Sequence, residues 1–152
     1  MLLDIITNEV LIIPICAWAL AQTLKMLIAV IKGKGFDLSY LVSSGGMPSA
    51  HSAMVSALAV SVGMTQGFGS AFFGIAVILA LIVIYDSAGV RQSVSQQSVV
   101  LNRIVHELKL RQPRVVWEAD LRELVGHTPF QVIVGAALGI AVAWLWLVLA
   151  GF

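Results

Sequence analysis

Charged side chains are scarce in this chain, in which Asp, Glu, Lys and Arg together make up 11% of the 152 residues. The formal net charge is only +1, so the chain lacks the positive charge that polyanion binding requires, and we expect no nucleic-acid partner. Hydrophobic residues, in contrast, make up 59% of the sequence, and the mean hydropathy is +0.97. This composition is too apolar for a soluble domain of this size. It predicts an integral membrane protein with one domain over residues 1–152.

The chain also has little cysteine and no basic residues in its first segment. Cys16 is the only cysteine, so no internal disulfide can form. The first residues carry Asp4 and Glu9 instead of the positive charge that begins a secretory signal peptide. The apolar segment after them is long enough to span a membrane. We therefore expect no cleavable signal peptide.

Four long apolar stretches predict an all-α membrane protein with about four transmembrane helices. The second is short unless its helix begins near Ser49. Between the third and the fourth, residues 92–110 have the spacing of an amphipathic surface helix, and residues 117–124 predict a short interfacial helix. The four apolar stretches are residues 10–31, 52–64, 70–85 and 132–149.

The positive charges predict how these helices are oriented. Four spans place the loop before the second helix and the long segment before the fourth on the same side of the membrane. All nine Lys and Arg residues fall at or near that side, which the positive-inside rule makes cytoplasmic. They are Lys25, Lys32, Lys34, Arg91, Arg103, Lys109, Arg111, Arg114 and Arg122.

The stretch from residue 45 to residue 53, Gly-Gly-Met-Pro-Ser-Ala-His-Ser-Ala, changes from a polar loop into an apolar helix. Gly46 allows a ligand to approach the backbone, and Pro48 suits the first turn of a helix. Free amides should therefore collect around Ser49 and form an anion site, with His51 beside it. The alternative interpretation is that Ser49 is only an N-cap and His51 an ordinary interfacial residue.

A second junction of the same kind follows at Gly126-His127-Thr128-Pro129-Phe130-Gln131, before the last apolar stretch. Two histidines thus stand at the starts of two predicted spans on the cytoplasmic side. A metal site would need a third ligand at helical spacing, and ion transport would need charges at the helix centres, where only Lys25 is found. Phosphoryl transfer through a phosphohistidine needs a nucleophilic His, a second His as proton donor, and cations with amides around the phosphate. The chain supplies all of these parts.

Other ionisable residues near these junctions have more than one interpretation. Lys25 shares a helix face with Gln22, and its side chain either snorkels to the interface or serves the site. Asp86 and Arg91 lie five residues apart at the end of the third stretch, where an interfacial ion pair is the alternative to a role in the site. The third histidine, His106, has no glycines or apolar junction near it, and we interpret it as a surface residue.

Residues 48–53, Pro-Ser-Ala-His-Ser-Ala, resemble the Pro-Ser-Gly-His motif of the type-2 phosphatidic acid phosphatases, which are related to the vanadium haloperoxidases. Residues 127–132 resemble the His-x-x-x-Asp motif of the same superfamily. Its small divergent bacterial and plastid branch is similar to this chain over most of its length. The resemblance implies that His127 is the nucleophile, His51 the general acid, and Ser49 with its neighbouring amides a phosphate ligand. It implies no metal and no cofactor.

The chain departs from the superfamily's pattern at three places. Leu121 stands where the third motif has Arg, although Arg122 is next to it. Gln131 replaces the Asp that orients the nucleophilic imidazole, and an amide cannot stabilise an imidazolium as a carboxylate does, so Asp86 or Glu123 is expected to supply the charge. The first motif, Lys-x6-Arg-Pro, is reduced to Lys25-x6-Lys32 followed by glycine.

The predicted function is therefore a metal-independent membrane phosphatase acting on a lipid phosphate monoester or diphosphate. Phosphatidic acid, phosphatidylglycerol phosphate and polyprenyl diphosphates all fit this class. The alternative is a catalytically weak lipid-phosphate-binding or structural membrane protein. The expected location is a bacterial inner membrane or its plastid equivalent, and the small residues from Gly135 to Gly139 suggest a homodimer. The predicted phosphate ligands are Gly46, Ser49, Lys25, Arg91 and Arg122.

Overall fold

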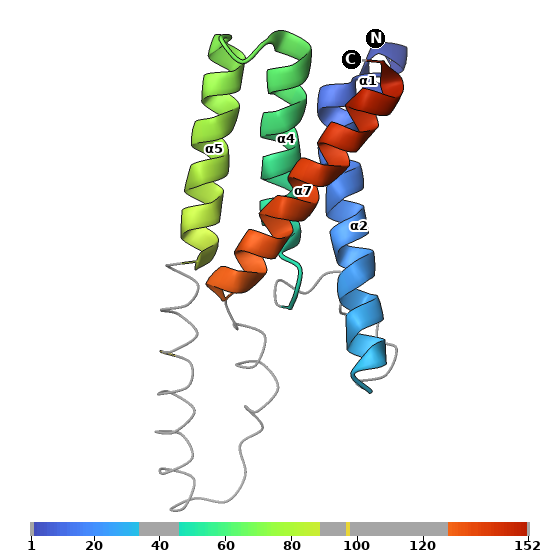
Figure 1. Cartoon of the computed structure of the whole chain (residues 1–152), viewed down its shortest axis with the longest axis vertical. Coiled ribbons are helices and arrows are strands. Elements are labelled where there is room, and N and C mark those ends of the chain that lie inside the picture. Colours follow the sequence, from blue (N-terminus) through green and yellow to red (C-terminus); the bar gives the residue numbers. More distant parts are fainter. Residues whose placement is uncertain (1, 34–45, 89–96, 98–127, 152) are drawn as a thin grey trace, which may run out of the picture.

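The computed structural model describes residues 2–33, 46–88, 97 and 128–151 of the chain. Every element in these ranges is a helix, and no strand is present among them, which confirms the predicted all-α fold for the described residues. Figure 1 shows the helices as a bundle. They are α1 (Leu2–Ile6), α2 (Glu9–Ile31), α4 (Ala50–Gln66), α5 (Ala71–Ala88) and α7 (Pro129–Ala150).

The four longer helices coincide with the four apolar stretches of the sequence. α4 begins at Ala50, directly after its N-cap Ser49, and α7 begins at Pro129, one turn before the apolar run itself. With 23 and 22 residues, α2 and α7 are long and apolar enough to cross a membrane, whereas α4 and α5 are shorter. The surface helix predicted within residues 92–110 lies outside the described residues except at Gln97, and the interfacial helix predicted at 117–124 lies wholly outside them.

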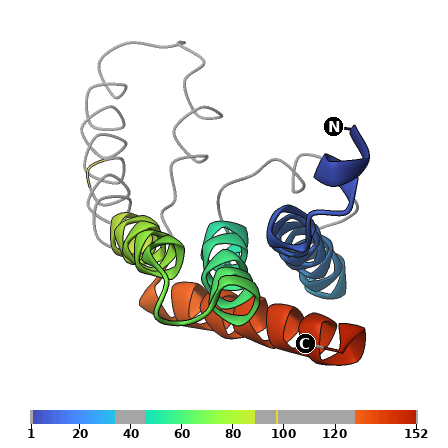
Figure 2. The same cartoon turned by 90° about the horizontal axis from the view of Figure 1, so that it is seen from above.

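α4 is the central helix of the bundle. It packs against α2, α5 and α7, whereas α5 makes most of its contacts with α4 alone. Seen from above, α5, α4 and α2 form a row, and α7 crosses one face of that row (Figure 2). The first residues of α4 and of α7 therefore lie near the same end of the bundle.

The contact between α4 and α7 depends on two glycines one turn apart. A Cβ at Gly135 would collide with the backbone carbonyl oxygen of Ser49, and a Cβ at Gly139 would collide with that of Ala53. Only glycine allows the two backbones to approach so closely. The close helix contact predicted from these small residues exists, but it is made within the chain. The homodimer stays a prediction.

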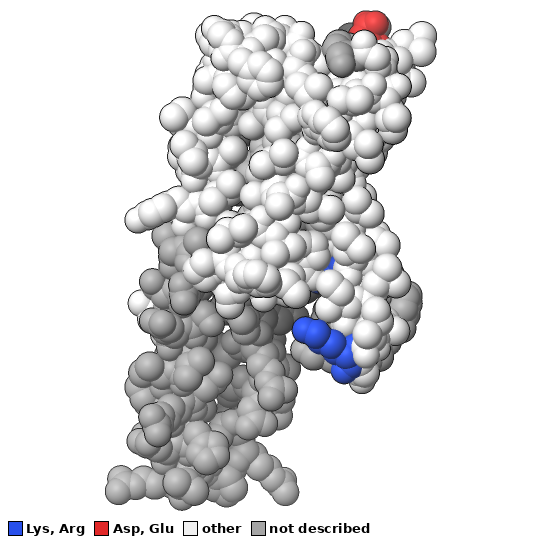
Figure 3. Space-filling view, in the orientation of Figure 1, with Lys and Arg blue, Asp and Glu red and all other residues white. Residues whose placement is uncertain are grey.

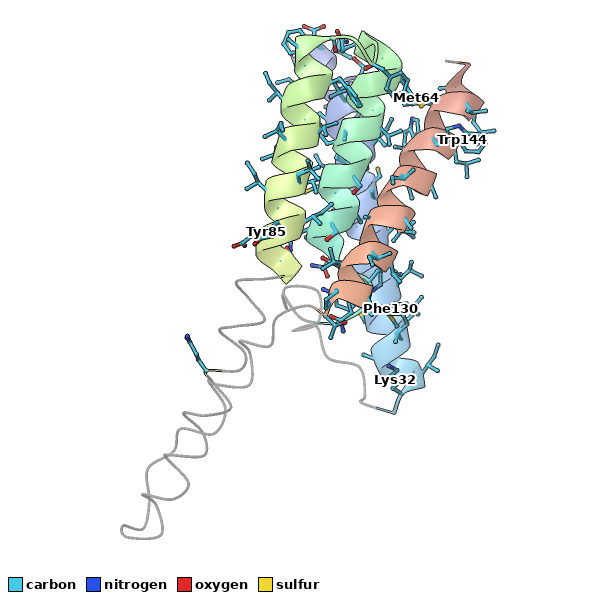
Figure 4. All side chains as sticks on the ribbon, turned by 60° about the vertical axis from the view of Figure 1, so that its left-hand side comes forward. Lys32, Met64, Tyr85, Phe130 and Trp144 are labelled. Carbon is cyan, nitrogen blue, oxygen red and sulfur yellow. The ribbon has the colours of Figure 1, made fainter. Side chains whose placement is uncertain are left out.

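The surface of the described bundle is apolar. Large hydrophobic side chains such as Phe72, Ile75, Phe130 and Leu149 are exposed on the outer faces of the helices. Figure 3 shows almost no charge on the face it presents, with positive charge toward one end and negative charge at the other. Lys32 and Phe130 lie toward one end of the bundle and Met64 and Trp144 lie nearer the other (Figure 4). Such a surface suits a hydrocarbon environment.

Candidate active site

Ser49 starts α4 as its N-cap. Its Oγ accepts a hydrogen bond from the Ser52 backbone N–H at 3.4 Å and another from the Ser52 hydroxyl at 3.0 Å. The side chain is fully buried, with 0% of its surface exposed. The capping role that the sequence allowed is therefore present, and the phosphate-binding role of Ser49 stays a prediction. The contribution of Ser52 was not expected.

Thr128 and Gln131 start α7 with a reciprocal capping box. The Thr128 hydroxyl accepts from the Gln131 backbone N–H at 3.4 Å, and Gln131 Oε1 accepts from the Thr128 backbone N–H at 3.2 Å. Pro129 occupies the first helical turn, where a backbone N–H has no partner within the helix. The lack of an N–H in proline therefore costs no hydrogen bond there. The Thr-x-x-Gln spacing is a known signal for this motif, and sequence reasoning missed it. Gln131 thus fixes the helix start that directly follows His127 in the chain.

The two helix starts are joined by their backbones. The Ser49 N–H donates to the carbonyl oxygen of Gln131 at 3.1 Å, and Gly135 packs one turn further along against the same Ser49. The N-terminal ends of α4 and α7, which both carry a positive partial charge, therefore lie next to each other. His51 lies in the first turn of α4 and is exposed there. The pairing of His51 with His127 stays a prediction, because His127 lies outside the described residues.

Lys25 approaches this place from α2. Only 4% of its surface is exposed, and it lies on the buried face of that helix. Gly46 has a φ of +94°, which favours glycine, and a Cβ there would lie 3.2 Å from Cγ of Lys25 and 3.3 Å from its Cδ. The Lys25 stem thus packs on the turn before α4 and does not extend along the outside of α2, as a snorkelling side chain would.

Gln22, one turn before Lys25, is a buried residue to which the sequence pattern assigns no role. It is 6% exposed, and its Oε1 has no hydrogen-bond partner within the described structure. Its neighbour Ala21 packs against Ala50 and Ala53, so this turn of α2 lies beside the first turn of α4. The three-residue spacing between Gln22 and Lys25 indicated a shared face, but not that the face would be buried.

The structure thus brings Gly46, Ser49, Lys25 and Gln131 together, with His51 at the same helix start. Asp86 lies in the last turn of α5 and is exposed, and no described contact joins it to these residues. Among the described side chains, no group of three or more His, Cys, Asp and Glu could hold a metal ion. The remaining predicted site residues lie outside the described residues: Arg91, Arg122, Glu123 and His127.

The chain is similar to one known family and to one known membrane protein. The family described as the Divergent PAP2 family matches residues 6–142, a range that includes both helix starts. The chain is also 36% identical to the uncharacterized membrane protein YuiD of Bacillus subtilis, and the match covers 99% of both chains. No solved structure matches. The composition, the apolar helices and these two similarities identify a membrane protein that belongs to the divergent PAP2 family.

Proposed function

We propose that this protein is a metal-independent membrane phosphatase that hydrolyses a lipid phosphate monoester or diphosphate through a phosphohistidine. The observation that carries the proposal is the hydrogen bond from Ser49 N–H to the Gln131 carbonyl oxygen. It holds the helix start that bears His51 against the one that directly follows His127. In the proposed site, the nucleophile His127 and the proton donor His51, which are far apart in the sequence, act at this place.

The proposed reaction has two steps. In the first, a ring nitrogen of His127 attacks phosphorus, the bond from phosphorus to the leaving oxygen breaks, and protonated His51 gives its proton to that oxygen. In the second, water attacks the phosphohistidine, His51 accepts a proton from the water, and the P–N bond breaks to release phosphate. The amides at the two helix starts and the ammonium of Lys25 stabilise the charge on the remaining oxygens.

The other predicted residues complete this arrangement. Arg91 and Arg122 are candidates for a second cation on the phosphate. Asp86 or Glu123 supplies the negative charge that favours the His127 imidazolium, because the amide of Gln131 supplies none.

The substrate class follows from the surroundings of the two helix starts. Phe130, the second residue of α7, is 65% exposed, and Ile133 one turn further is equally exposed. An apolar wall directly beside an anion site suits a headgroup whose hydrocarbon tail remains in the bilayer. We propose that all four long helices span the membrane and that the site faces the cytoplasm of a bacterium or the corresponding side of a plastid membrane.

One observation favours a second function, the binding of a lipid phosphate with little or no turnover. Gln131 Oε1 accepts the Thr128 backbone N–H, so the residue that replaces the motif's Asp is engaged in capping α7. If neither Asp86 nor Glu123 supplies a carboxylate, the His127 imidazolium lacks its counter-charge, and catalysis would be slow.

Phosphate release from vesicles that contain phosphatidic acid tests the first function. The His127→Ala variant should lose turnover and any acid-labile phosphoenzyme, because His127 is the proposed nucleophile that forms the covalent intermediate. The matched control is His106→Ala, which removes the one histidine to which we assign no role and should leave both unchanged. Full activity in His127→Ala would contradict the mechanism. Binding without hydrolysis by the wild-type protein would favour the second function.

A further inference from the structure

Gln22 presents a buried hydrogen-bond acceptor that nothing in the described structure uses. A side-chain carbonyl that loses water on folding normally gains a partner, and its absence calls for an explanation. Oε1 of Gln22 has no partner, although the residue is 6% exposed. Because Oε1 can only accept, its missing partner must be a donor.

The surroundings of Gln22 restrict what this donor is. Ala21 packs against Ala50 and Ala53 in the first turn of α4, and Lys25 lies on Gly46, three residues before Ser49. Gln22 follows Ala21 directly and lies one turn before Lys25, and all three are buried residues of α2. The acceptor is therefore beside the helix start to which we assign phosphate binding, and a cation lies one helical turn from it.

A cation and a neutral acceptor together fit a phosphate that carries one negative charge and one proton. Lys25 attracts an anionic oxygen, whereas Oε1 repels it and accepts from a P–OH group. The monoanion of a phosphate monoester has both groups, and a phosphate diester has no P–OH. Building on the proposed function, we propose that Gln22 is a specificity-determining residue whose Oε1 accepts a hydrogen bond from the P–OH of a singly protonated lipid phosphate monoester.

Two lipids of equal charge allow a direct test. Phosphatidic acid at pH 5 is mostly the monoanion, because the second pKa of a phosphate monoester is about 6. Phosphatidylmethanol also carries one negative charge but has no P–OH group. Their binding is measured with the full-length His127→Ala protein in nanodiscs, in which turnover is excluded. The parent should prefer phosphatidic acid by roughly tenfold at pH 5, the ratio expected for one hydrogen bond.

The Gln22→Met substitution keeps the length of the side chain and removes the acceptor. It should reduce the preference to less than about twofold while leaving phosphatidylmethanol binding unchanged. At pH 8, where phosphatidic acid has lost the P–OH proton, the substitution should not weaken its binding. Gln22→Asn, which withdraws the amide by one methylene, should behave as Gln22→Met does and provides the test if that variant does not fold. Thr23→Val alters the adjacent exposed residue, whose hydroxyl bonds to Ala19 of its own helix, and is the control.

The outcomes separate this proposal from the proposed function. The role of Gln22 would be overturned if Gln22→Met and Gln22→Asn kept the preference for phosphatidic acid. It would also be overturned if they weakened the binding of both lipids equally, or weakened phosphatidic acid binding equally at pH 5 and pH 8. Wild-type turnover of phosphatidic acid is assayed in parallel. Turnover without an effect of Gln22 would contradict only the role of Gln22, and a Gln22-dependent preference without turnover would contradict only the phosphatase.

Discussion

Gln131 has a structural role that is independent of any catalytic one. Its Oε1 and its backbone N–H form the two halves of the capping box with Thr128, and its carbonyl oxygen accepts from Ser49. The motif resemblance led us to interpret Gln131 only as a partner for an imidazole. The spacing to Thr128 would have predicted the cap, but the contact with Ser49 is between backbone atoms, which carry no sequence signal.

Replacing Gln131 separates capping from charge. Gln131→Glu keeps an acceptor for the Thr128 N–H and adds a negative charge at the helix N-terminus, which is worth roughly 0.3–1 kcal/mol. We expect a melting temperature equal to or above that of the wild type, and faster phosphate release if the carboxylate reaches His127. Gln131→Leu removes the acceptor and should lower stability by about 0.5–2 kcal/mol. Thermal unfolding in detergent measures both changes, and an unaltered melting temperature in Gln131→Leu would show that the Gln131 side chain contributes nothing to the cap.

The buried amide of Gln22 predicts a gain in stability when it is removed. An unsatisfied buried carbonyl costs about 1–3 kcal/mol, and Met occupies a similar volume without that cost. Gln22→Met should therefore raise the melting temperature of the ligand-free protein, whereas Thr23→Val should not. A lower melting temperature in Gln22→Met would mean that the amide already has a partner in the free protein.

At the scale of helices, the sequence predicted the positions of the elements well and their partners poorly. Apolar runs bounded by glycine, proline and capping residues located α2, α4, α5 and α7. The small residues from Gly135 to Gly139 indicated a close helix contact, which the structure contains. A pattern on one helix identifies the face that is in contact but not the helix that covers it. Here α4 covers the two glycines, and the homodimer remains untested.

Two glycines allow a matched test of this contact. At Gly135 a Cβ would collide with the Ser49 carbonyl oxygen, whereas at Gly74 in α5 a Cβ would meet nothing within 4 Å. Gly135→Ala should destabilise the protein by about 1–3 kcal/mol and displace the two helix starts, so phosphate release should also fall. Gly74→Ala should raise stability by about 0.4–1 kcal/mol because alanine favours the helix. Equal effects of both substitutions on thermal unfolding would contradict the packing described for α4 and α7.

For the whole molecule, hydropathy and charge predicted a membrane protein, but helix length alone does not establish four spans. α2 and α7 satisfy the length criterion, whereas α4 has only 17 residues. A short helix can still cross a membrane when the bilayer thins locally or its flanking residues reach the interface. The site was predictable where it consists of residues at helix starts. The buried positions of Lys25 and Gln22 were not, because they depend on how α2 packs against α4.

Cysteine labelling tests the number of spans. In a Cys16→Ala background, Gln66→Cys places an exposed thiol at the end of α4, and Lys32→Cys places one just beyond α2. If α4 spans the membrane, a membrane-impermeant maleimide added to intact cells should label position 66 and not position 32. Permeabilised cells should be labelled at both positions. Labelling of both positions from outside intact cells, or of neither, would contradict the four-span topology.

The bond between Ser49 and Gln131 also affects when the protein becomes competent during its synthesis. The ribosome completes α4 early, but the helix start that Ser49 contacts belongs to α7, which is translated after α4 and α5. A nascent chain held in the translocation machinery therefore contains only half of the joined arrangement. Any chain terminated before α7 would lack the arrangement entirely, so an active site built on it would be silent until α7 has been made.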